Sequence, residues 1–119
     1  MHIVADLAVA LVAVLHAGFL VLEMLLWDTP FGRRTFGLSA EFARASKALA
    51  ANQGLYNGFL AAGLAWGLAL GQDGHAIKVF FLACVIVAGV FGALSVSRRI
   101  LAVQAAPAAL ALVLVLAAR

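Results

Sequence analysis

Charged residues, cysteine and proline are scarce in this sequence. Of its 119 residues, 8 are Lys or Arg and 5 are Asp or Glu, so 11% are charged, against about 25% in soluble domains. The single cysteine, Cys84, excludes an intrachain disulfide and a Cys-x-x-Cys redox pair. That absence argues against four-helix thiol oxidoreductases, and we interpret Cys84 as a helix-packing residue.

Long apolar runs are what the sequence has instead, since 66% of its residues are hydrophobic. Four runs approach or exceed the roughly 20 residues that cross a bilayer: residues 3–27, 49–70, 77–96 and 100–118. Lipid tolerates no unpaired backbone, so such runs form helices. We therefore predict an all-α fold, a four-transmembrane-helix bundle in one integral membrane domain spanning residues 1–119.

The first run is not expected to be a signal peptide. No Lys or Arg precedes it, and it is longer than an h-region.

The basic residues lie in the loops between the runs and form no continuous face, so we expect no nucleic-acid partner despite a net charge of +3. By the positive-inside rule, the loops that carry most of them face the cytoplasm. The residues concerned are Arg33, Arg34, Arg44, Lys47, Arg98 and Arg99. This predicts a multi-pass protein of the cell's inner (plasma) membrane with both termini outside.

The long first loop changes character along its length. Residues 28–37 contain Pro and Gly and are expected to be irregular. From Leu38 the pattern is that of an amphipathic helix, with Ser39 as its N-cap, leading into the second span. Its basic side chains either attract anionic lipid headgroups or serve only as a positive-inside anchor.

Polar residues inside the spans are the candidate ligand-binding site. His16 and Glu23 share a face of the first helix, while Asn52 with Tyr56, and Gln53 with Asn57, are each one turn apart on the second. The full set of candidates is His16, Glu23, Asn52, Gln53, Tyr56, Asn57 and Gln104.

Glu23 carries most of this hypothesis, because a charge at the centre of a membrane helix costs about 3 kcal/mol. Alternatives remain open at this stage. Glu23 lies one turn from Trp27 and could be an interfacial anchor that pairs with a basic residue. Intramembrane amides also serve as interhelical contacts, worth on average about 0.6 kcal/mol each.

Small residues on the second helix allow close packing. Gly54 and Gly58 have one Gly-x-x-x-Gly spacing, and Gly63, Gly67 and Gly71 form a longer ridge. These glycines fit either packing within the chain or a homo-oligomer, a dimer or trimer.

No cofactor is expected. His2 and His75 are placed at the outer surface, away from His16, so two histidines at one depth for haem are lacking. His16 and Glu23 also lack a third metal ligand.

Several strings in the chain are distinctive: "EMLLWDTPFGRRTFG", "ANQGLYNGFLAAGLAWG", "CVIVAGVFGA" and "VQAAPAALAL". In these, the sequence resembles a widespread family of small bacterial integral membrane proteins of unknown function, which implies four helices and no established activity.

The chain is also similar, more weakly, to the MAPEG superfamily of glutathione-linked membrane enzymes, which implies a homotrimer. Asn52 corresponds to that superfamily's second-helix asparagine. The glutamate expected three residues later is Leu55, and the third-helix aromatic is Phe91 instead of tyrosine.

Three functions follow as hypotheses. The first is an intramembrane polar pocket near the cytoplasmic side that binds a small amphipathic molecule or lipid. The second is a MAPEG-like enzyme with an anionic thiol cosubstrate, and the third is a small proton-coupled exporter with Glu23 as its exchange site. Whether the protein is an enzyme stays open.

Overall fold

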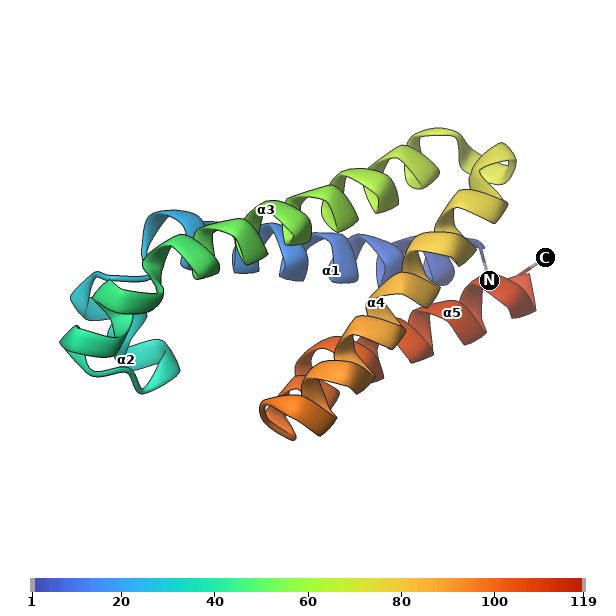
Figure 1. Ribbon diagram of the computed structural model, residues 1–119. Coiled ribbons are helices and arrows are strands. Elements are labelled where there is room, and N and C mark those ends of the chain that lie inside the picture. Colours follow the sequence, from blue (N-terminus) through green and yellow to red (C-terminus); the bar gives the residue numbers. More distant parts are fainter. Residues whose placement is uncertain (1, 119) are drawn as a thin grey trace. The chain divides into compact units, whose positions relative to one another are not determined.

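The computed structural model describes residues 2–118, which form α-helices joined by short helical segments (Figure 1). In chain order the elements are α1 (His2–Leu20), the π-helical segment η1 (Val21–Leu25), α2 (Pro30–Phe36), α3 (Ala40–Ala69), the 3-10 segment η2 (Gly71–Gly74), α4 (His75–Ser95), the π-helical segment η3 (Leu101–Ala105) and α5 (Ala106–Ala118). The prediction of an all-α fold is confirmed.

The chain divides into two compact units. The first unit combines residues 1–14 with residues 60–119, and the second unit is residues 15–59. Because α1 and α3 each run through both, the units share these two helices.

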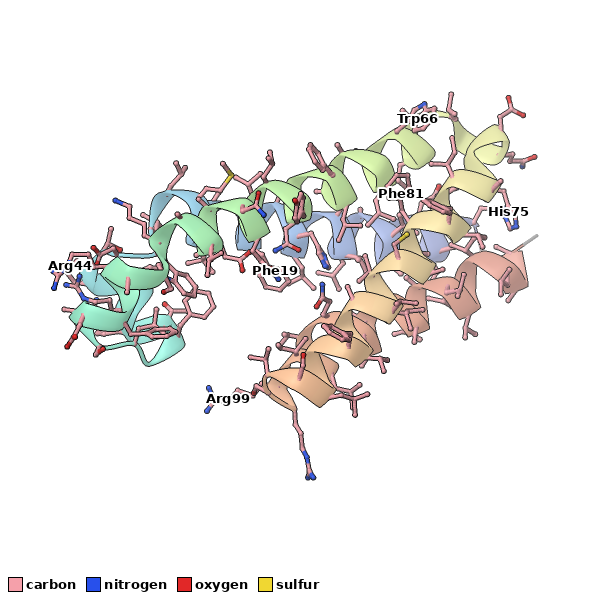
Figure 2. The ribbon with its side chains drawn as sticks, viewed as in Figure 1. Phe19, Arg44, Trp66, His75, Phe81 and Arg99 are labelled. Atoms are coloured by element: carbon pink, nitrogen blue, oxygen red, sulfur yellow. The ribbon has the colours of Figure 1, made fainter. Side chains whose placement is uncertain are left out.

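The core of the first unit is built from small and branched aliphatic side chains on four helices. Its buried residues include Val9 and Val12 of α1, Leu64 of α3, Leu82 and Val85 of α4, and Ala108, Ala111 and Val115 of α5. Close helix approach depends on glycine, since a Cβ on Gly89 of α4 would lie 2.8 Å from the Cβ of Ala105. Figure 2 shows Phe81 of α4 on the side of α3, where its ring meets Gly63.

In the second unit, residues of the first loop and of α3 pack around Trp27. The indole Nε1 of Trp27 donates to the Ser46 hydroxyl of α3 at 3.0 Å, and its ring lies 4.9 Å from that of Phe36, between centroids. Such an indole, apolar on its faces and polar at its nitrogen, suits a boundary between lipid and water.

The segment 28–37, expected to be irregular, contains α2 instead. Thr29 caps this helix by accepting a hydrogen bond from the Gly32 N–H at 3.1 Å, and Pro30 stands at its first position. Gly37 ends it with a φ of 66°, the left-handed conformation that favours glycine. Proline and glycine here mark the two ends of a helix, so the prediction of irregular structure was wrong.

The prediction for the next segment is confirmed. Ser39 accepts a hydrogen bond from the Phe42 N–H at 3.0 Å, as an N-cap does, and α3 continues unbroken from Ala40 to Ala69. The amphipathic segment and the predicted second span are therefore one helix of 30 residues.

Three helical stretches are long and apolar enough to cross a membrane: His2–Leu25, Gly71–Ser95 and Leu101–Ala118. They agree with the first, third and fourth predicted spans. The α3 helix is not in this group. Asn52, Gln53 and Asn57 interrupt its apolar run, so its passage through a membrane, and with it the four-span bundle, stays a prediction.

Candidate functional site

Glu23 lies in a distorted turn at the end of the first apolar helix. The Leu26 N–H donates to the Val21 carbonyl at 3.2 Å, an i to i+5 bond that makes Val21–Leu25 a π-helical segment. Neither of the two prolines, Pro30 and Pro107, lies within this segment. Short π segments inside helices occur frequently at functional sites. The distortion therefore singles out Glu23 independently of its charge.

Asn57 of α3 is the partner of Glu23. Its amide nitrogen Nδ2 donates to Glu23 Oε1 at 2.5 Å, joining α3 to η1 inside the second unit. The Asn57 side chain is buried, whereas Glu23 is half-buried. Among residues 2–118, Asn57 is the single side chain that donates to this carboxylate. An ionised carboxylate accepts up to about four hydrogen bonds, so Glu23 retains accepting capacity.

Gly54 makes this approach of η1 and α3 geometrically feasible. A Cβ built on Gly54 would lie 3.1 Å from Glu23 Cβ, 3.2 Å from the Leu20 carbonyl oxygen and 2.6 Å from Met24 Cγ. The adjacent position of the same spacing, Gly58, faces the Leu20 side chain. The Gly-x-x-x-Gly pair is thus used for packing within the chain.

The other polar residues of the "NQGLYNG" string point elsewhere. Asn52, Gln53 and Tyr56 are all exposed on α3, Tyr56 to 54%. The Tyr56 ring lies 6.1 Å from that of Phe59, between centroids. Of the four polar side chains in this string, the structure brings Asn57 to Glu23 and leaves three on the open surface of the helix.

The remaining two predicted residues occupy different surroundings. His16 is completely buried, with the Phe19 ring packed edge-on at 5.1 Å between centroids. Gln104 is half-buried in the first unit, within η3.

The π-helical segment that contains Gln104 has a cause in the sequence. The Ala106 N–H donates to the Leu101 carbonyl, five residues back. Pro107 follows directly; it has no N–H, and its ring would clash with the carbonyl four residues earlier in a regular helix. Pro107 thus accounts for the π turn in this helix. No proline directly follows the π turn at Glu23, so its sequence gives no comparable signal.

The sequence reasoning missed one polar arrangement in the first unit. Lys78 Nζ of α4 lies 3.3 Å from Asp6 Oδ1 of α1, beside a cavity of about 650 Å³. Lys78 is not among the residues predicted for a site. Its position inside an apolar run was the available signal, because a cation within a span is costly without a partner.

In the part of the chain that the structure describes, no three His, Cys, Asp or Glu residues are grouped closely enough to hold an ion.

Together these features define the class: a small all-helical protein with three helices long and apolar enough to cross a membrane. Within that class the chain belongs to the family described as "Protein of unknown function (DUF1304)", which matches residues 10–116. The predicted membership in a family of unknown function is confirmed. No curated protein and no solved structure matches the chain. The similarity to MAPEG enzymes stays an expectation.

Proposed function

We propose that this protein is a multi-pass membrane protein that binds a small amphipathic molecule or a lipid at Glu23. The observation that carries this proposal is the placement of a carboxylate in a π turn, held by one buried amide from α3. The Asn57 bond fixes Oε1 in position and leaves the other carboxylate oxygen, Oε2, to meet a ligand's hydroxyl, amine or amide.

The location of Glu23 favours a ligand that is part polar and part apolar. Val21, Met24 and Leu25 beside it are exposed, as lipid-facing side chains are. Trp27, four residues on, donates its indole N–H to Ser46, as an indole does at a membrane interface. A headgroup at this depth reaches Glu23 while its chain lies along the apolar surface.

The exposed face of α3 next to Asn57 supplies additional polar groups. Asn52 and Gln53 carry amides, and an amide facing hydrocarbon without a hydrogen bond costs several kcal/mol, roughly 4 to 8 on a water-to-cyclohexane scale. Binding of a ligand's polar group, or of a second copy of this helix, would remove that cost. The homo-oligomer, a dimer or trimer, is therefore part of this proposal, with Asn52 on its contact face.

The proposed orientation follows from the basic residues. Arg33 and Arg34 lie in α2, the first α-helix after η1, and Lys47 is next to Ser46, the hydrogen-bond partner of Trp27. The positive-inside rule therefore puts the Glu23 and Trp27 region in the cytoplasm. The ligand would then enter from the cytoplasmic side or the inner leaflet.

The proposal is tested by identifying the amphiphiles that copurify with the protein. The protein is purified in detergent, and bound amphiphiles are extracted and identified by mass spectrometry from the parent, Glu23→Gln and Glu41→Gln. Glu41 is an exposed acid in the first turn of α3, so its variant makes the same chemical change away from the site. We expect Glu41→Gln to retain the ligand and Glu23→Gln to lose it. Equal retention by both variants would contradict the proposal.

A further inference from the structure

A second polar site lies entirely within the first unit. The open cavity of about 650 Å³ is lined by the start of α1, η2, the start of α4 and the end of α5. Its polar lining residues are His2, Asp6, Gln72, His75 and Lys78. Figure 2 shows His75 at the junction of η2 and α4. None of these residues belongs to the site at Glu23.

Lys78 is the buried charge of this cavity. Its side chain is only 9% exposed, whereas that of Asp6 is 50% exposed. The Lys78 stem packs on the α3 backbone at Gly67, where a Cβ would lie 2.7 Å from Lys78 Cγ and 3.2 Å from Lys78 N. Glycine at position 67 therefore creates the space in which this lysine is held.

The ion pair leaves Lys78 with unused donors. An ammonium group has three N–H donors, and among residues 2–118 Asp6 Oδ1 is the single acceptor for Lys78. Their separation of 3.3 Å exceeds the roughly 2.7–2.9 Å of a strong charge-assisted bond. The ammonium is thus paired weakly and remains able to bind a stronger anion.

The rest of the lining favours negative charge. Two helices begin here, α1 at His2 and α4 at His75, and two end here, α3 at Ala69 and α5 at Ala118, so the helix dipoles largely cancel and the side chains decide which charge is favoured. No side chain caps the start of α4. His2, His75 and Gln72 can each donate a hydrogen bond, and Asp6 is the one acid in the described lining.

We propose that this cavity binds a phosphate group, with Lys78 as its charge partner and His75 and Gln72 as further donors. A phosphate oxyanion has the charge and the number of acceptor oxygens to use several donors at once. Asp6 then competes with the ligand for Lys78. Two candidate membrane spans start at this cavity, at His2 and at Gly71, and a third ends there at Ala118. The cavity is therefore at the end of the spans, where either a phospholipid headgroup or free phosphate can supply the phosphate group.

The competition between Asp6 and the ligand gives the decisive test. Inorganic phosphate is titrated by calorimetry into protein in a maltoside detergent, with sodium chloride at matched ionic strength as the reference. Because Asp6→Asn removes the competing charge, we expect it to bind phosphate several-fold more tightly than the parent. Lys78→Gln should bind about tenfold more weakly, as loss of a charge-assisted bond implies.

The control is Lys47→Gln, which removes an exposed lysine of α3 outside the cavity and should bind as the parent does. Lys78→Arg keeps the charge and should retain binding. If Lys78→Gln does not fold, the Asp6→Asn variant tests the proposal by itself. Asp6 is half-exposed, so its replacement is compatible with folding. Weaker or unchanged phosphate binding by Asp6→Asn would overturn the proposal, as would binding by the parent no stronger than that of chloride.

The same titration with dihexanoyl phosphatidylglycerol below its micelle concentration separates the two sources. At least tenfold tighter binding of this lipid than of inorganic phosphate identifies a headgroup site. Equal affinity identifies a site for the free anion. Both results require Lys78, so failure of either ligand to respond to Lys78→Gln overturns the assignment.

Discussion

The side-chain amide of Asn57 donates to the Glu23 carboxylate at 2.5 Å, across 34 residues of sequence. Asn57 is buried on α3, so this bond both satisfies a polar group inside the protein and orients the acid. Its two roles can be separated experimentally, because glutamine keeps the shape and hydrogen-bonding oxygen of glutamate but not its charge.

We predict that Glu23→Gln folds with a thermal stability near that of the parent, whereas Glu23→Leu is destabilised by about 1 to 3 kcal/mol. Leucine leaves the buried Asn57 amide without its acceptor, which carries that penalty. Unfolding of the detergent-solubilised variants, followed by circular dichroism, measures the difference. Glu41→Leu is the control at an exposed acid of the same helix. Equal stability of Glu23→Leu and the parent would show that the bond contributes nothing to folding.

A double-mutant cycle should detect the pair directly. Glu23→Leu and Asn57→Leu each leave one partner unsatisfied, but the double variant leaves none, so it should lose less stability than the sum of the single changes. We expect a coupling energy of about 0.6 kcal/mol, and no more than about 1.7 kcal/mol, as for measured intramembrane hydrogen bonds. Additive losses would mean that the two side chains do not interact in the folded protein.

Gly54 provides a prediction about packing. Gly54→Ala should destabilise the protein by about 1 to 3 kcal/mol, because the new methyl group would lie 3.2 Å from the Leu20 carbonyl oxygen and 3.1 Å from Glu23 Cβ. Gly18→Ala is the matched control, since a Cβ there meets nothing within 4 Å. That control should be neutral or stabilising by up to about 1 kcal/mol, the helix-propensity difference. Similar melting temperatures for both variants would show that η1 and α3 do not approach so closely.

The sequence predicted those features that depend on local rules. Apolar length placed the helices, and the N-cap at Ser39 followed from its position before an amphipathic run. The same rules were sufficient for α2, where Thr29, Pro30 and Gly37 are an N-cap, a first-turn proline and a C-terminal glycine. Composition alone does not distinguish these three residues from those of an irregular loop.

The site was less predictable, because it depends on contacts between distant residues. Helical spacing placed Asn52, Tyr56 and Asn57 on one polar segment, but it could not say that Asn57 alone faces Glu23 while the others are exposed. The partnership of Lys78 with Asp6 spans 72 residues and requires knowing that α1 and α4 are neighbours. The π turn at Glu23 could not be predicted either, because no proline is adjacent to it.

The last prediction concerns orientation. With basic α2 in the cytoplasm, the η2 segment lies outside, so single cysteines in the two segments should react with an impermeant thiol reagent from opposite faces of the membrane. Thr35→Cys and Asp73→Cys, each in a Cys84→Ala background, are suitable because both side chains are exposed. Gly32 and Gly74 are not, since a Cβ at either would overlap backbone atoms. In intact cells Asp73→Cys should label and Thr35→Cys should not, while detergent should make both reactive. Labelling of Thr35→Cys from outside would reverse the orientation, and the ligand proposed for Glu23 would then enter from the outer side.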